Sequence, residues 1–217
     1  MDVLVVGGHG KIALRLLGLL AARGDRARGL IRNPDQAADL EAAGAIPIIG
    51  DLESDATLEP YVKGADAVVF AAGAGPGSGD ARKATVDLGG AVKLIDAAQA
   101  LGVRRYVMIS SIGADRPEAA SGSMLPYLRA KAEADRRLID SGLDFTIIRP
   151  GSLTDTPSTG RVRLTTELGG RASVARNDVA EVLAEVLRTP STAGLIAELF
   201  AGDTPVTEAV RTLRPAP

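Results

Sequence analysis

Short, continuous apolar runs alternate with amphipathic segments along most of the chain. Continuous apolar runs are typical of strands buried on both faces of a sheet, and apolar spacing of three or four residues is typical of helices. The predicted strands are residues 3–6, a run ending at Ile31, and residues 46–49, 67–73, 103–109, 145–148 and 195–200. The predicted helices are one from Lys11 that stops at Gly24, and residues 35–42, 58–62, 81–101, 126–141 and 178–187.

This alternation predicts an α/β fold of the doubly wound Rossmann type. A parallel sheet would have helices on both faces and the strand order 3-2-1-4-5-6, with a seventh strand from the C-terminal part. No linker or repeat divides the chain, so residues 1–217 are expected to form a single NAD(P)-binding Rossmann domain. Its small substrate-side portion would come mainly from residues 151–217.

Three stretches are long and weakly patterned, namely residues 73–80, 112–125 and 151–161. Each follows the carboxyl end of a predicted strand, and this is the edge at which open α/β sheets bind ligands. We interpret these stretches as lids over a site, with plain disorder as the alternative.

The first apolar run leads through a glycine turn directly into a helix. Gly7 suits the tight turn, Gly10 lets a pyrophosphate approach the backbone, and Ala13 allows the helix to pack closely on the strand. The helix N-terminus presents backbone N–H groups and a positive dipole end to an anion. The spacing therefore predicts dinucleotide binding, although any tight turn uses glycine and a plain turn is the alternative.

The end of the second apolar run indicates which dinucleotide binds. An NAD site usually has an acidic residue there, whereas an NADP site has arginine. This chain has Arg32 and Asn33, and the nearest acid, Asp35, lies beyond Pro34. A guanidinium matches phosphate oxygens. We predict NADP (NADPH) as the cofactor; the alternative for Arg32 is a solvated charge at a strand end.

Tyr127 and Lys131 are four residues apart in a predicted helix and share one face. An ammonium near a phenol lowers the phenol pKa and makes it a usable acid or base nearer neutrality. A hydroxyl of Ser110 or Ser111, at the end of a predicted strand, could hold a substrate carbonyl oxygen while Tyr127 moves the proton. The alternatives are an ordinary surface pair and serines that only cap helices.

Asp87 lies between apolar neighbours in the predicted helix 81–101, which suggests an inward position. A buried carboxylate is costly without a hydrogen-bond partner, so Asp87 would need a partner or water at the site. Exposure to solvent is the alternative.

Composition excludes several classes of protein. Cysteine is absent and His9 is the single histidine, so disulfides, thiolate catalysis and multi-histidine metal sites are excluded, and no metal is predicted. The net charge of −2 and the lack of a basic run predict no nucleic-acid partner. No uncharged apolar stretch reaches about 18 residues and the start lacks a signal-peptide pattern, so we expect no membrane partner and a cytoplasmic protein.

The motifs together resemble those of the atypical short-chain dehydrogenase/reductases. In chain order they are GGHGKIA at residues 7–13, Arg32, Gly50-Asp51-Leu52, Ala71-Ala72-Gly73, Ser110-Ser111, Tyr127-x-x-x-Lys131 and Arg149-Pro150-Gly151. The chain is most similar to the small NAD(P)H-binding, NmrA-like and NAD-dependent epimerase/dehydratase-like proteins of that family. The resemblance covers nearly the whole chain.

The resemblance implies roles for the residues at these motifs. Tyr127 would be the acid/base, Ser111 (or Ser110) would orient the carbonyl, and Lys131 would hold the nicotinamide ribose. Asp87 completes the implied catalytic set, but it stands where many members have asparagine, which leaves the proton relay open. The residues implied in cofactor binding are Gly7, His9, Gly10, Lys11, Ile12, Arg32, Asn33, Asp51, Leu52, Ala71, Ala72, Gly73, Ser110, Lys131, Pro150 and Gly151.

These observations predict an NADP(H)-binding oxidoreductase that exchanges hydride with a small-molecule carbonyl or alcohol substrate. Two alternatives stay open: a non-catalytic NADP(H)-sensing regulatory protein of the NmrA-like kind, and an NAD(P)-dependent epimerase or dehydratase that retains its cofactor. The intact Tyr-x-x-x-Lys motif favours an enzyme, and Asp87 favours the sensor. The long helices could pair into a homo-oligomer, but their exposed faces do not decide the oligomeric state.

Overall fold

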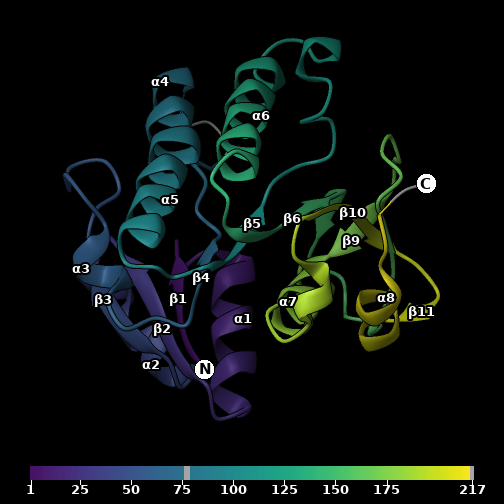
Figure 1. Ribbon diagram of the computed structural model, residues 1–217. Helices are drawn as coiled ribbons and strands as arrows, with labels where there is room; N and C mark the ends of the chain where they lie inside the picture. The colour runs from purple at the N-terminus through teal and green to yellow at the C-terminus, as the bar shows by residue number, and fades with distance from the viewer. Residues whose placement is uncertain (76–78, 216–217) are drawn as a thin grey trace.

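The apolar runs form one mostly parallel sheet with helices on both of its faces (Figure 1). The computed structural model describes residues 1–75 and 79–215. Within these ranges the sheet has nine strands, which in spatial order are β11 (Thr204–Pro205), β8 (Arg161–Thr165), β10 (Leu195–Ala201), β6 (Asp144–Pro150), β5 (Arg105–Ile109), β4 (Ala67–Phe70), β1 (Asp2–Val6), β2 (Arg26–Ile31) and β3 (Ile46–Ile49). The parallel part confirms the predicted order 3-2-1-4-5-6, and β10 is the predicted seventh strand.

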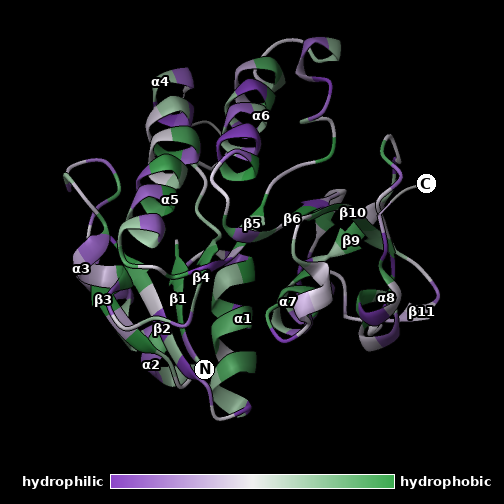
Figure 2. Cartoon of the chain, viewed as in Figure 1, coloured by the Kyte–Doolittle hydropathy of each residue, from purple (hydrophilic) through white to green (hydrophobic). Residues whose placement is uncertain are grey.

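The strands are continuously apolar because both faces of the sheet are covered. Val3 and Val5 contact one helical layer, whereas Leu4 and Val6 contact the other, and all four are fully buried. The first layer holds α1 (Lys11–Ala22), α2 (Ala37–Ala42), α7 (Arg176–Val186) and α8 (Val206–Thr212). The second layer holds α3 (Glu59–Val62), α5 (Ala91–Ala100) and α6 (Met124–Ile139). Figure 2 shows hydrophobic central strands, a largely hydrophobic α1, and alternating hydrophilic and hydrophobic positions along α5 and α6.

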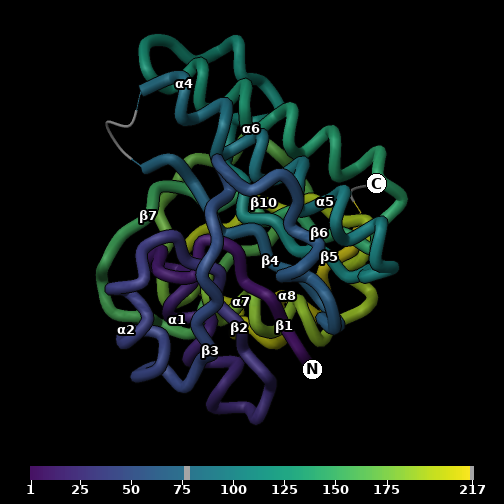
Figure 3. The backbone as a smooth tube through the Cα atoms, turned by 90° about the vertical axis from the view of Figure 1, so that its left-hand side faces the viewer, coloured from purple at the N-terminus to yellow at the C-terminus, as the bar shows by residue number. Residues whose placement is uncertain are grey.

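The predicted helix 81–101 is divided into three segments. A short α4 (Asp80–Arg82) leads into a π-helical segment η2 (Lys83–Gly90), which continues as α5. The wider π turn changes which side chains face inward, and it buries Val86, Asp87 and Gly90. At the top of both views, α4 lies beside α6 (Figures 1 and 3), and Lys83 Nζ donates a hydrogen bond to the carbonyl of Ser123.

The C-terminal part contains short strands that the sequence pattern did not predict. β8 pairs antiparallel with both β10 and β11, while β7 (Ser152–Thr154) and β9 (Ser173–Ala175) form a separate parallel pair. The weakly patterned stretch 151–161 is therefore not a loop throughout, since it contains β7 and the first residue of β8. Strands of two or three residues are too short to show an apolar period.

The weakly patterned stretch 112–125 also has structure of its own. Residues 112–125 include a 3₁₀ turn, η3 (Pro117–Ala119), and the first two residues of α6. The stretch 73–80 lies partly outside the described residues. A second 3₁₀ turn, η1 (Pro34–Gln36), precedes α2, and a third, η4 (Pro190–Thr192), follows α7.

Candidate functional site

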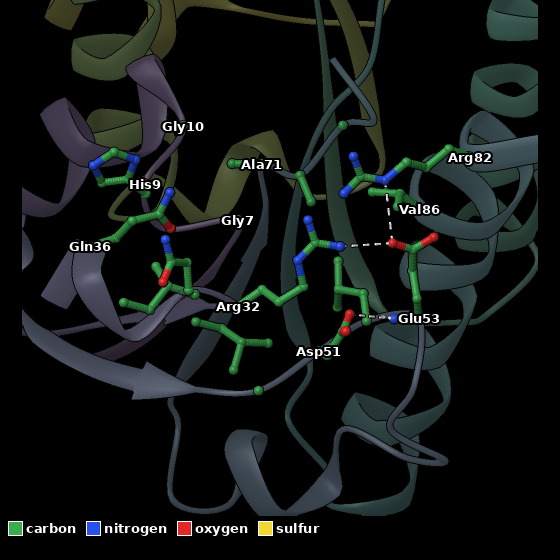
Figure 4. Close-up of a pocket in the computed structure, with 17 residues that line it drawn as sticks. Gly7, His9, Gly10, Arg32, Gln36, Asp51, Glu53, Ala71, Arg82 and Val86 are labelled. Carbon is green, nitrogen blue, oxygen red and sulfur yellow. Dashed lines mark hydrogen bonds and ion pairs between the residues drawn. The ribbon is translucent and has the colours of Figure 1, made fainter. Parts of the chain in front are cut away.

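A pocket of about 360 Å³ lies at the carboxyl ends of β1, β2, β3 and β4 (Figure 4). It brings together most of the predicted cofactor-binding residues. Those that line it are Gly7, His9, Gly10, Arg32, Asn33, Asp51, Leu52, Ala71, Ala72 and Gly73. Gly50 of the Gly50-Asp51-Leu52 motif also lines it, and so do residues to which the sequence assigned no role in the site, namely Leu30, Ile31, Gln36, Glu53, Arg82 and Val86.

The glycine turn forms the floor of this pocket. Gly7 has a φ of 84°, a left-handed conformation that favours glycine, and a Cβ there would lie 2.7 Å from the Cα of Ala72. The Gly10 N–H donates to the carbonyl of Gly7 at 2.9 Å, and the Leu14 N–H donates to that of Gly10. The first N–H groups of α1, including that of Ile12, have no partner within the helix and can bind an anion. The side chain of Ile12 itself packs in the core.

Arg32 crosses the pocket from the end of β2 to Glu53 (Figure 4). Its Nη1 lies 3.0 Å from Glu53 Oε2, and Arg82 Nε lies 3.3 Å from the same oxygen. The hydroxyl of Thr85 donates to Glu53 Oε1 at 2.8 Å. This hydrogen bond from Thr85, followed by the two guanidinium groups, lowers the pKa of Glu53 from its ordinary value.

The segment after β3 is held in place by a network of hydrogen bonds. Asp51 Oδ1 accepts from the Glu53 N–H at 2.9 Å, and the Asp51 N–H donates to Asp55 Oδ2 at 2.7 Å. The hydroxyl of Tyr61 donates to the same Asp55 oxygen at 2.9 Å. The Asp51 N–H and then the Tyr61 hydroxyl lower the pKa of Asp55. Because Lys93 Nζ also donates to the carbonyl of Leu52, the wall formed by residues 51–53 is fixed on both sides.

A second group of predicted residues meets between η2 and α6. Lys131 Nζ lies 3.2 Å from Asp87 Oδ1 and donates to the Ile109 carbonyl at 3.3 Å. Asp87 Oδ2 accepts from the Ala74 N–H at 3.0 Å. Asp87 therefore has the buried, hydrogen-bonded position that the sequence suggested, and the alternative of exposure to solvent was wrong. Lys131 Nζ lies 5.9 Å from the centre of the half-buried Tyr127 ring.

The two serines after β5 have different surroundings. Ser110 is buried, and its hydroxyl donates to Asp135 Oδ2 at 2.9 Å. Arg149 Nη2 lies 2.9 Å from the same oxygen. Burial raises the pKa of Asp135, while Arg149 and Ser110 act in the opposite direction. The hydroxyl of Ser111 is only partly buried and donates to the Ile112 carbonyl, so Ser111 is the serine with access to a ligand.

Several predicted cofactor residues do not line the pocket: Lys11, Ile12, Ser110, Lys131, Pro150 and Gly151. The ammonium of Lys11 pairs with Asp155 at 2.7 Å. The Pro150 carbonyl accepts from the Ile112 N–H and the Gly151 N–H donates to Leu199, which joins the ends of β5, β6 and β10. His9 does line the pocket, but its Nε2 contacts Asp39 at 2.7 Å.

The described part of the chain has neither a metal-binding cluster nor a membrane-spanning helix. Within residues 1–75 and 79–215, no group of three or more histidine or acidic side chains could hold a metal ion. No helix in these ranges is both long and apolar enough to cross a bilayer.

The chain is similar to several known proteins. A family model described as NAD(P)H-binding matches residues 7–190. An uncharacterized sugar epimerase, YhfK, of Bacillus subtilis (strain 168) is 39% identical over 98% of this chain and 100% of its own length. A solved structure from Bacillus halodurans, assigned by name to the NAD-dependent epimerase/dehydratases, is 40% identical, with a TM-score of 0.94 over 98% of this chain and 100% of that one. The oxidoreductase ylbE of Lactococcus lactis is 29% identical, with a TM-score of 0.85 over 98% of this chain and 96% of that one.

Proposed function

Because the chain belongs to the NAD(P)H-binding family of atypical short-chain dehydrogenase/reductase-like proteins, we propose that it is an oxidoreductase that prefers NADP(H). The observation that carries this proposal is the pocket, in which a glycine turn with a left-handed Gly7, the N-terminus of α1 and the guanidinium of Arg32 line one cavity. The turn and the N-terminus suit a pyrophosphate, and Arg32 suits the 2′-phosphate of the adenosine ribose. The names of the relatives, which include an oxidoreductase, are consistent with this function.

Different residues around the pocket would contact different parts of the cofactor. Asp51 and Leu52 would contact the adenine, and Ala71, Ala72 and Gly73 would run beside the pyrophosphate and ribose. The nicotinamide ribose would reach Lys131, whose ammonium has three donors and uses only part of them on Asp87 and Ile109. When bound, the nicotinamide supplies hydride chemistry.

In this proposal the protein supplies the proton for a small carbonyl substrate, or removes it from an alcohol. The Tyr127 hydroxyl transfers that proton, and the Ser111 hydroxyl holds the substrate oxygen. Lys131 provides a positive charge near Tyr127, with Nζ 5.9 Å from the ring centre. Asp87 stands where many members of the family have the proton-relay asparagine. Its carboxylate accepts a hydrogen bond from the Ala74 N–H and has no amide N–H to donate.

The ion pair between Lys131 and Asp87 also favours a second candidate, a regulatory protein that binds NADP(H) without turnover. A carboxylate at 3.2 Å offsets much of the field of the ammonium, which leaves less positive charge to act on Tyr127. A third candidate is an epimerase or dehydratase that keeps its cofactor, in line with the names of two relatives. Nucleotide that co-purifies with the protein would favour this candidate.

The test is a titration of the purified protein with NADPH and with NADH, followed by nicotinamide fluorescence. We expect binding of both, with higher affinity for NADPH. A screen of carbonyl acceptors then follows NADPH consumption. Binding without consumption of NADPH by any acceptor would favour the regulatory candidate, and failure to bind either dinucleotide would overturn the proposal.

A further inference from the structure

We propose that Arg32, Arg82 and Glu53 together read the 2′ position of the adenosine ribose, so that the two arginines admit NADP(H) and Glu53 admits NAD(H). This inference rests on the proposed function, namely that the pocket holds a nicotinamide dinucleotide. It adds two residues that determine cofactor specificity, Arg82 and Glu53. It also assigns Glu53 a role opposite to that of the arginines.

Three elements bring these side chains to one wall of the pocket (Figure 4). Arg32 comes from the end of β2, Glu53 from the turn after β3, and Arg82 from α4. Both guanidinium groups contact one carboxylate oxygen, Glu53 Oε2, at 3.0 and 3.3 Å. All three side chains keep contact with solvent, with 55%, 30% and 39% of Arg32, Glu53 and Arg82 exposed, so a ligand can reach them.

The charges at this wall suit an incoming phosphate. Two guanidinium groups face one carboxylate, which leaves a net positive charge between them. A phosphate monoester carries about −1.5 to −2 charges near neutral pH and offers several acceptor oxygens to arginine. The carboxylate of Glu53 occupies the same donors, so a 2′-phosphate has to displace it.

Thr85 makes this displacement inexpensive. Its hydroxyl donates to Glu53 Oε1 at 2.8 Å, whereas both arginines contact Oε2. Glu53 can therefore turn Oε2 toward solvent and keep one hydrogen-bond partner. The carboxylate acts as a resident anion that neutralises the arginines until a phosphate replaces it.

The same carboxylate suits a cofactor without the phosphate. A ribose 2′-hydroxyl donates a hydrogen bond, which a carboxylate accepts and a guanidinium does not. The end of β2 lacks an acid, since Asn33 follows Arg32. The fold compensates by placing Glu53, which lies 21 residues further along the chain, in contact with Arg32.

The test compares Glu53→Gln and Arg82→Gln with the wild-type protein. Each is titrated with NADPH and NADH, and by calorimetry with 2′,5′-ADP and 5′-AMP, which isolate the adenosine half from nicotinamide chemistry. Arg129→Gln and Glu118→Gln are matched controls, because they break an exposed Arg–Glu pair of 2.8 Å whose residues do not line the pocket. Circular dichroism checks that each variant folds.

For Arg82→Gln we expect NADPH and 2′,5′-ADP to bind about tenfold more weakly, with NADH and 5′-AMP within about twofold of wild type. For Glu53→Gln we expect the opposite shift: NADPH binds about threefold to tenfold more tightly and NADH binds more weakly. Both controls should leave all four affinities unchanged. A high salt concentration should weaken 2′,5′-ADP more than 5′-AMP.

Two results separate this inference from the proposed function. If the wild type binds NADPH but Arg82→Gln does not reduce the ratio of NADPH to NADH affinity, the inference is overturned and the proposed function stands. If Glu53→Gln weakens NADPH, Glu53 orients the arginines instead of competing with the phosphate, which also overturns the inference. A wild type that binds neither dinucleotide overturns both.

Discussion

The ammonium of Lys131 lies 3.2 Å from Asp87 Oδ1, and the two side chains are only 4% and 1% exposed. This buried ion pair joins η2 to α6. Removing one member of a buried pair leaves the other charge uncompensated, which is far more costly than removing both. The pair therefore has a structural role that is separate from any role in turnover.

We expect Lys131→Met and Asp87→Asn each to lower the free energy of unfolding by about 3–5 kcal/mol, because each leaves a buried charge without its partner. The double variant should cost less than the sum, with a coupling of about 1–3 kcal/mol. Urea unfolding followed by far-UV circular dichroism measures this, since the chain has no tryptophan.

A matched double-mutant cycle on Arg136 and Asp140, an exposed pair of 3.0 Å on α6 and its C-cap, should show no measurable coupling. Additive losses for Lys131 and Asp87 would contradict the structural role of the buried pair.

Tyr127→Phe should reduce turnover at least about 100-fold, since it removes the hydroxyl that transfers the proton. The affinity for NADPH should stay within about twofold of wild type. Steady-state kinetics with an acceptor from the screen, together with an NADPH titration, measures both quantities. Tyr106→Phe is the control, because it removes a tyrosine hydroxyl that is fully buried in β5, whereas Tyr127 is only half-buried. Retained turnover in Tyr127→Phe would end the acid/base proposal.

Arg32→Glu should weaken NADPH by about 100-fold and NADH by much less, because it replaces a phosphate ligand with a repelling charge beside Glu53. Competition titrations of the two dinucleotides on one preparation give the ratio directly. Equal losses for both dinucleotides would remove Arg32 from the phosphate site.

Arg149→Met should destabilise the protein in a pH-dependent way. Burial raises the pKa of Asp135, and Arg149 opposes this rise more strongly than the other nearby cation, Lys131, so the loss of Arg149 raises that pKa further. A carboxyl whose folded-state pKa lies above its unfolded value contributes stability at low pH and loses it as the pH rises through the folded pKa. The deficit should thus be small near about pH 4.5 and reach about 3–5 kcal/mol near about pH 7.5.

Urea unfolding of Arg149→Met at the two pH values checks this sign. Arg104→Met is the control, since Arg104 pairs with Asp144 at an exposed position, 2.8 Å away. That variant should behave alike at both pH values. If Arg149→Met lost the same free energy of unfolding at both pH values, Arg149 would not control the pKa of Asp135.

Local sequence pattern was sufficient to predict the parallel strands and the glycine turn, and the alternation of strands and helices indicated the fold type whose strand order the sheet follows. Apolar runs such as residues 3–6 are continuous because the sheet is covered on both faces, and this requirement is visible one strand at a time. The conformation of Gly7 is also a local property, since its φ of 84° lies in the left-handed region that favours glycine. Such features can be predicted from neighbouring residues alone, without knowing which distant residues contact them.

Only the tertiary structure decided which charged groups meet. Glu53 lies 21 residues beyond Arg32 in the chain, and Arg82 lies 50 residues beyond it. The two arginines meet at the carboxylate of Glu53 because β2 and β3 are neighbouring parallel strands that end at the same edge of the sheet, where Arg82 of α4 also lies. The burial of Asp87 depends on a π-helical turn, and the strands β7, β9 and β11 depend on partners distant in sequence. Short segments acquire these structures from long-range contacts, which no local period of apolar residues encodes.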